Sequence, residues 1–163
     1  MCFFCCTFAA KYQTMKQDQI YNITEASLTS VELEIADDLH AGFPNPASDY
    51  AGETIDLARE MVRHPESTFY ARIKGDSMLD AGICDGDIVV VDRALRPNNG
   101  DFVVAHIDGE FTLKEYQLDE QNQCVWLIPH NAKYQRIKVT VENDFCVWGV
   151  ITYCVHRCGR NRL

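Results

Sequence analysis

The 163-residue sequence predicts a mostly-β domain with one short helix and an extended N-terminal arm. After residue 66 the chain consists of short runs rich in β-branched and aromatic residues, separated by turn residues. One segment before these runs has helical periodicity, and the residues before Gly42 contain neither Gly nor Pro. Many short strands with few helices are typical of a sandwich or a partly open barrel. We expect one of these two architectures.

The N-terminal arm differs from the rest of the chain. Its stretch "TSVELEIADDL" alternates Val31, Leu33 and Ile35 with glutamates, which is typical of a strand or an extended arm. No pair of amphipathic helices flanks a short turn, so a helix-turn-helix is excluded. The sequence therefore predicts an arm of residues 1–42 followed by a β-rich domain of residues 43–163.

A linker and a helix are predicted next. Pro44 and Pro46 in "AGFPNPASDYAGE" fix φ and remove two backbone donors, which indicates a stiff, exposed linker. "ETIDLAREMVRH" then has apolar residues at helical spacing, and Pro65 ends the predicted helix. The apolar positions of that helical face are Ile55, Ala58, Met61 and Val62.

Seven runs after the helix are predicted to be strands, because each is rich in strand-forming residues and ends at turn residues. They are Thr68–Lys74, Asp87–Asp92, Asp101–Ile107, Glu110–Gln117, Cys124–Ile128, Arg136–Val141 and Phe145–Val155. The dipeptide Asp108-Gly109 predicts a tight hairpin between the third and fourth runs.

Charge and the N-terminal segment bear on partners and location. The 24 acidic residues outnumber the 15 Lys and Arg, giving a net charge of −9, and this argues against direct sequence-specific DNA binding. A protein partner is favoured instead. The start "MCFFCCTFAA" follows no positive charge and is too short to span a bilayer, so we expect neither a secretory signal nor a membrane association. A cytoplasmic location is expected.

The eight cysteines have no regular spacing, and a chain of this length does not need disulfides to fold. We therefore expect reduced thiols. A metal site remains an alternative, although a single C-x-x-C is a weak signal, and no metal or cofactor is predicted. Its candidate ligands are Cys2, Cys5, Cys6, Cys154, His156 and Cys158.

Ser77 is the candidate nucleophile. It lies in "KGDSMLDAGICDGDIVVVD", where Gly and Asp residues shape a bend. A serine hydroxyl needs a base, and no His here has a motif around it. Lys114 in "DGEFTLKEY" projects from the strand face opposite Phe111 and Leu113, and burial of that face would lower the pKa of Lys114. From pattern alone, a turn serine and a solvated lysine are the commoner interpretation.

Several separated motifs favour the catalytic interpretation of Ser77 and Lys114 instead. "FPNPASDY", "KGDSMLDAGICDGDIVVVD", "GDFVVAHIDGEFTLKEYQL" and "WLIPHNAKY" together resemble the UmuD branch of the LexA/UmuD self-cleaving family, over residues 41 to about 155. The resemblance implies a LexA/signal-peptidase-like β-rich catalytic domain. It also implies that Ser77 attacks a peptide bond of its own chain and that Lys114 is the base. The backbone N–H groups of Asp76 and Ser77 are expected to form the oxyanion hole.

The expected scissile bond is Ala41–Gly42. Small residues ahead of a proline-stiffened linker offer an exposed, extended segment. Ala51–Gly52 has the same residues, but it adjoins the predicted helix, where an extended conformation is harder to reach. Cleavage at Ala41–Gly42 is expected to leave Gly42–Leu163 with every strand and therefore folded.

The resemblance further implies a function in the SOS response to DNA damage. The RecA–single-stranded-DNA filament would stimulate self-cleavage, and the product would act as a homodimer with a Y-family, UmuC-like polymerase subunit in translesion synthesis. One alternative is a signal-peptidase-like enzyme that cuts other chains. Another is a non-cleaving regulator, or an antagonist that dimerises with LexA-like proteins. Attack within one chain and attack between dimer partners both remain open.

Overall fold

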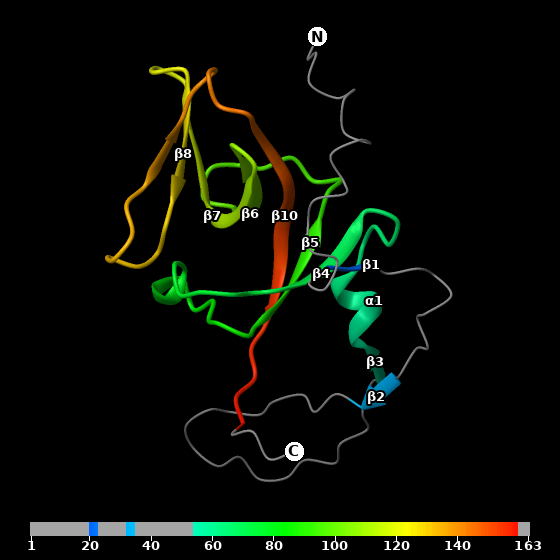
Figure 1. Ribbon diagram of the computed structural model, residues 1–163. Coiled ribbons are helices and arrows are strands. Elements are labelled where there is room, and N and C mark those ends of the chain that lie inside the picture. Colours follow the sequence, from blue (N-terminus) through cyan, green and yellow to red (C-terminus); the bar gives the residue numbers. More distant parts are fainter. Residues whose placement is uncertain (1–19, 23–31, 35–53, 160–163) are drawn as a thin grey trace.

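The computed structural model describes residues 20–22, 32–34 and 54–159, and these form one large sheet and one small sheet (Figure 1). The elements are β1 (Ile20–Asn22), β2 (Glu32–Glu34), β3 (Thr54–Asp56), α1 (Leu57–Met61), β4 (Thr68–Arg72), the 3₁₀ helix η3 (Leu79–Ala81), β5 (Ile88–Asp92), β6 (Phe102–Ile107), β7 (Glu110–Asp119), β8 (Cys124–Ile128), β9 (Ile137–Val139) and β10 (Phe145–Val155). The predicted mostly-β fold is confirmed. No helix within these ranges is long and apolar enough to cross a membrane.

The large sheet is antiparallel throughout and has the order β1-β4-β5-β10-β6-β7-β8-β9. All seven strands predicted after the helix are present, and the bounds of β8 and β10 agree with the prediction. Two further strands, β1 and β2, belong to the arm. The expectation that cleavage would retain every strand is therefore wrong, because both precede Ala41–Gly42.

The predicted helix begins later than its sequence pattern suggested. Thr54–Asp56 forms strand β3, in which Ile55 pairs with Leu33 of β2. Asp56 then caps α1, because its carboxylate accepts hydrogen bonds from the N–H groups of Ala58 and Arg59. The helix ends at Met61, before the β-branched Val62, whose backbone is extended. Ile55 is thus a strand residue, which corrects the prediction of one longer helix.

The hairpin between β6 and β7 matches its prediction. Asp108 and Gly109 have φ values of +48° and +96°, as a two-residue turn with left-handed residues requires. This turn sets a register in which Val103 of β6 lies opposite Lys114 of β7. The hairpin therefore fixes where the candidate base lies in the sheet.

The large sheet is strongly bent and packs on both faces (Figure 1). Phe102 and Val104 of β6 contact one hydrophobic core, whereas Val103 and Ala105 contact the other. Alternation of this kind places the two cores on opposite sides of the strand. Two apolar cores on one sheet explain how a chain with so little helix can bury its strands.

The large sheet bends along strand β10. Its first half pairs with β6 and its second half with β5, and the register shifts between Val147 and Gly149 and again between Ile151 and Tyr153. At Gly149 an added Cβ would lie 2.7 Å from Val91 Cγ1. A glycine is required there because β5 approaches β10 so closely.

Trp148 of β10 joins parts of the sheet that are not neighbours. Its ring lies against Phe69 of β4, with ring centroids 4.4 Å apart, and against Phe111 of β7, with centroids 5.2 Å apart. These aromatic contacts link β4 to the start of β7 through β10. The candidate active site lies at this junction.

Candidate active site

Ser77 lies in the turn between β4 and η3. Gly75 adopts a φ of +104°, which favours glycine, and its N–H donates to Asp85 Oδ1 over 2.7 Å. The following loop is attached to the same stretch, because the Ile73 N–H donates to the Asp87 carbonyl and the Gly86 N–H to the Ile73 carbonyl. Ser77 itself is half-buried beside the buried Met78. Glycine and aspartate residues thus shape the bend that carries the hydroxyl.

Lys114 lies on β7 and reaches Ser77. Its side chain is only 6% exposed, and its Nζ lies 2.9 Å from Ser77 Oγ. The same Nζ also bonds Thr112 Oγ1 at 2.9 Å and the Leu113 carbonyl at 2.8 Å. The two predicted residues, 37 positions apart in the sequence, are therefore brought into direct hydrogen-bond contact.

The surroundings of Lys114 favour a neutral amine. Burial lowers the pKa of Lys114, because desolvation penalises the ammonium form. No carboxylate among the described residues bonds to Nζ to oppose this effect. In the neutral amine, two N–H bonds can point to the Leu113 carbonyl and the Thr112 hydroxyl oxygen. The lone pair then faces the hydroxyl of Ser77, which is the arrangement a proton acceptor needs.

The loop after β8 holds the serine turn in place. The His130 N–H donates to the Ser77 carbonyl over 2.9 Å, and the Asp80 N–H donates back to the His130 carbonyl over 2.8 Å. The Asn131 side-chain amide donates to the Asp76 carbonyl over 2.7 Å. Three hydrogen bonds therefore fix the turn from a segment more than fifty residues away in the sequence.

Asp76 faces the same loop. Its carboxylate accepts from the Tyr134 hydroxyl at 2.5 Å and from Lys133 Nζ at 3.2 Å. Hydrogen bonds from Tyr134 and Lys133 hold the pKa of Asp76 below its usual value. An ionised carboxylate bound in this way orients the turn and is a poor proton donor. Nothing in the local pattern "HNAKY" indicates that its residues contact the serine turn.

A groove runs past the Ser77 hydroxyl. It has a volume of about 250 Å³ and lies between residues 71–75 on one side and residues 111–113 on the other. Ser77 and Trp148 also line it. Because residues 71–72 of β4 and 111–113 of β7 line it as extended strands, the groove suits an extended peptide better than a compact ligand.

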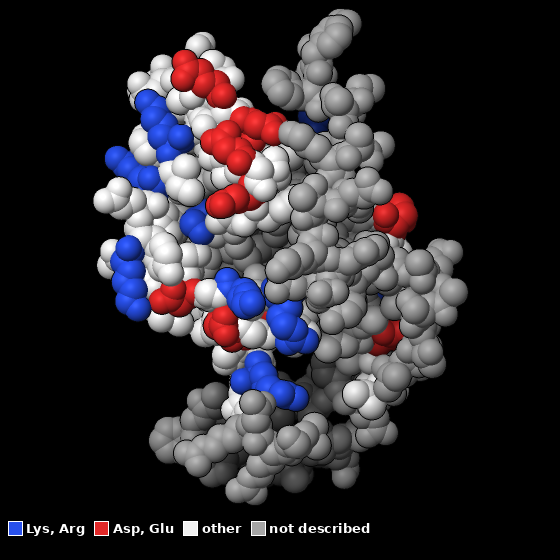
Figure 2. All heavy atoms as spheres, viewed as in Figure 1, with Lys and Arg blue, Asp and Glu red and all other residues white. Residues whose placement is uncertain are grey.

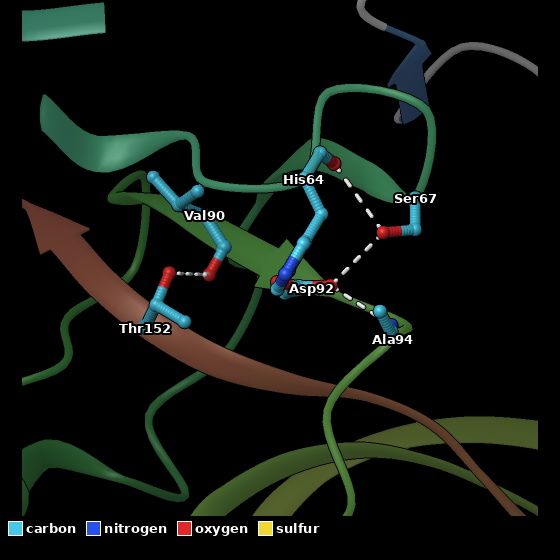
Figure 3. Close-up of polar contacts among 6 residues, drawn as sticks. All are labelled: His64, Ser67, Val90, Asp92, Ala94 and Thr152. Atoms are coloured by element: carbon cyan, nitrogen blue, oxygen red, sulfur yellow. Dashed lines mark hydrogen bonds and ion pairs between the residues drawn. The ribbon is translucent and has the colours of Figure 1, made fainter. Parts of the chain in front are cut away.

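A second serine near a histidine and an aspartate does not form a comparable pair (Figure 3). His64 Nδ1 lies 2.5 Å from Asp92 Oδ2, but the Ser67 hydroxyl bonds Asp92 Oδ1 and the His64 carbonyl. The hydroxyl thus contacts the carboxylate and a backbone oxygen, and no hydrogen bond links it to the imidazole. This cluster fastens the turn before β4 to the end of β5, and it lacks the serine–base contact that a triad needs.

Ala41 and Gly42 lie outside the described residues, as do Ala51, Gly52 and the three N-terminal cysteines. No disulfide bond joins the described cysteines at positions 84, 124, 154 and 158.

The bent β sheet, with a serine and a buried amine beside a peptide-sized groove, defines the class as a β-rich peptidase-like domain. The model of the Peptidase S24-like family matches residues 34–152, and the chain belongs to this family. This confirms the resemblance to the LexA/UmuD proteins and the predicted fold class.

Individual relatives agree with this assignment. The chain is 43% identical over 122 residues to protein ImpA of Escherichia coli, covering 75% of this chain and 81% of that protein. It is 40% identical over 116 residues to protein MucA of Escherichia coli, covering 71% and 77%. The LexA repressor of Carboxydothermus hydrogenoformans is 40% identical over 103 residues, covering 63% of this chain and 50% of the repressor. The family and these relatives support a peptidase with a role in SOS mutagenesis.

Proposed function

We propose that the chain cuts its own Ala41–Gly42 bond, with Ser77 as nucleophile and Lys114 as base. The observation that carries the proposal is the 2.9 Å contact between Ser77 Oγ and the buried Lys114 Nζ. The neutral amine takes the hydroxyl proton while Oγ attacks the carbonyl carbon of Ala41. The resulting ammonium then donates a proton to the amine of Gly42 as the peptide bond breaks. Water hydrolyses the ester, with Lys114 again accepting a proton.

The backbone N–H groups of Asp76 and Ser77 stabilise the oxyanion that forms on Ala41. Within the part of the chain that the structure describes, the Ser77 N–H donates to no protein acceptor, so it remains available to a substrate oxygen. Donors that are already fixed cost no reorganisation during the reaction. The hydrogen bonds from His130 and Asn131 to this turn support such a role, because they hold the backbone in place.

The topology of the arm favours delivery of Ala41–Gly42 as an extended loop. Residues 35–53 connect β2 to β3, and the two ends of this loop are paired, with Glu34 opposite Thr54. Ala41 follows Glu34 by seven residues, which allows a reach of up to ~24 Å when the backbone is extended. The groove beside Ser77 suits such an extended segment. Ala51 precedes Thr54 of β3 by only three residues, which limits its reach from that strand to ~10 Å.

In the SOS response, the RecA–single-stranded-DNA filament would act by favouring the conformer in which this loop is docked. The processed chain would then serve, as a homodimer, with a UmuC-like polymerase subunit in translesion synthesis. The sequence similarity to ImpA and MucA supports this role. On the face shown in Figure 2, basic side chains are mixed with acidic ones, which favours a protein partner over direct DNA binding.

The test is self-cleavage of the purified full-length chain, followed by intact-mass spectrometry with and without RecA filament. We expect a fragment beginning at Gly42 that is formed faster with the filament. Ser77→Ala and Lys114→Ala should abolish the fragment, because each removes one partner of the proton transfer. Gly42→Glu should block it by crowding the scissile bond.

Matched controls change the same residue types elsewhere. Ser67→Ala removes a hydroxyl bound to Asp92, and Lys138→Ala removes an exposed strand lysine. Both variants should cleave at the wild-type rate. Cleavage that persists in Ser77→Ala or Lys114→Ala would refute the assignment of these two residues as nucleophile and base. Normal processing of Gly42→Glu would show that the cleaved bond lies elsewhere.

A further inference from the structure

A cluster of metal-binding side chains lies apart from Ser77 and Lys114. Cys84, Asp87 and His156 each place one potential ligand atom within 4.8 Å of those of the other two. Cys84 and Asp87 belong to the loop between η3 and β5, and His156 follows the last residue of β10. The self-cleavage proposed above uses none of these groups.

Geometry and burial favour a ligand set over three unrelated surface groups. Asp87 is 4% exposed, and its Oδ1 lies 2.7 Å from His156 Nδ1. The Cys84 N–H donates to Asp87 Oδ2 over 2.8 Å, which orients the carboxylate as outer-shell hydrogen bonds orient metal ligands. Two ligands of one tetrahedral zinc ion lie ~3–4 Å apart, so small side-chain rotations suffice to bring these atoms onto one ion.

A further thiol, that of Cys154, lies beside the cluster. The Cys154 thiol lies 3.7 Å from Asp87 Oδ2, next to the three ligand atoms but not among them. The spacings Cys84-x-x-Asp87 and Cys154-x-His156 place two donors on each of two short segments, as structural zinc sites commonly do. Sulfur and imidazole donors favour zinc over magnesium or calcium.

We propose that Cys84, Asp87 and His156 bind a zinc ion that ties the end of β10 to the loop before β5. The sequence left open, only as an alternative, a metal site at Cys154, His156 and Cys158 with the N-terminal cysteines, which lie outside the described residues. Among the described residues, His156 pairs with Asp87. This loop also bonds residues 73 and 75, which line the groove beside Ser77. A bound ion would therefore restrain the wall of that groove.

Zinc affinity of the reduced full chain tests the proposal. A background with Cys2→Ser, Cys5→Ser and Cys6→Ser removes the N-terminal thiols, and zinc is titrated against a chromophoric chelator. We expect one equivalent to bind, and cobalt in its place to give the absorption of a tetrahedral thiolate site. Cys84→Ser and His156→Ala should each weaken zinc binding at least tenfold, because each removes a ligand.

Two matched substitutions separate this site from general thiol binding. Cys146→Ser changes a thiol in the first half of β10, and His106→Ala changes a histidine on β6. Both should bind zinc as the background does. Absence of zinc binding, equal loss in all four variants, or unchanged binding in Cys84→Ser and His156→Ala would each overturn the proposal. Circular dichroism of each variant shows that a lost site is not a lost fold.

Discussion

Thr112 illustrates at the residue scale how the candidate base is held. Its hydroxyl oxygen and the Leu113 carbonyl are the two oxygens, besides Ser77 Oγ, that contact Lys114 Nζ. When both N–H bonds of the neutral amine point at these oxygens, its lone pair points toward Ser77 Oγ. Thr112 thus acts as a positioning residue that works through Lys114.

Replacing Thr112 separates this positioning role from simple packing. Thr112→Val keeps the side-chain volume but removes the acceptor, so the amine loses one of its restraints. We expect self-cleavage to slow about tenfold, since small misplacements of catalytic groups are costly. Thr112→Ser restores the oxygen and should recover most of the rate, as timed mass spectrometry of the fragment can show. A Val variant that cleaves at the wild-type rate would refute the positioning role, and a Ser variant as slow as the Val variant would show that the hydroxyl alone does not hold Lys114.

Ser77 and Lys114 could be identified from the sequence only through the resemblance to the LexA/UmuD family. A serine in a turn and a lysine on a strand are each too common to indicate catalysis by themselves. The residues that hold the serine turn were missed for a physical reason. Asn131 donates to a backbone carbonyl 55 positions earlier, and nothing in a local pattern indicates a hydrogen bond over that separation. Long-range positioning contacts need the fold before they can be identified.

At the scale of elements, runs of β-branched residues predicted the strands well. These residues favour the strand conformation and are also the ones buried in the sheet. The run Ile88–Asp92 contains three consecutive valines with no exposed surface, and β5 appears where it was expected. The three-residue β1 was missed because "IYN" is too short to show alternation. The helix start was wrong because Asp56 is a capping residue whose effect outweighs the apolar spacing around Ile55.

The close approach of β5 to β10 gives a test at this scale. Gly149→Ala places a Cβ 2.7 Å from Val91 Cγ1 and 3.1 Å from the Asp92 carbonyl oxygen, so the Val91 side chain or one of the two strands must shift. We expect the free energy of unfolding to fall by about 1–3 kcal/mol, as for overpacked cores. Chemical denaturation measures the change. Gly159→Ala is the control, because its Cβ would meet no atom within 4 Å and should cost less than about 0.5 kcal/mol. Equal stability of the two variants would contradict the observed strand contact.

At the scale of the whole molecule, self-cleavage would change the sheet as well as shorten the chain. β1 pairs with β4 along Phe69–Ala71, and β2 pairs with β3. Because β1 and β2 precede Ala41–Gly42, the fragment Gly42–Leu163 lacks both. β4 would then become an edge strand beside the groove, and an open edge is a surface to which another chain can add a strand.

Hydrogen exchange can detect this opening. In Gly42–Leu163 the β4 amides that face β1 should exchange at least about tenfold faster than in uncleaved Ser77→Ala, because their partner strand is gone. The β5 amides that bond β10 provide the internal control and should not change. Unaltered exchange in β4 would mean that β1 does not protect this edge in the intact chain, or that another segment replaces it.

The pH dependence of self-cleavage tests the central claim, proton transfer from Ser77 to Lys114, most directly. Burial lowers the pKa of Lys114, so the neutral base becomes populated below the usual value of 10.5. The rate of formation of the Gly42–Leu163 fragment should therefore rise with pH and reach half its maximum below pH 10.5. Lys114→Arg, which stays protonated throughout, should show no such rise. A rate that is independent of pH, or an identical profile in Lys114→Arg, would contradict the account.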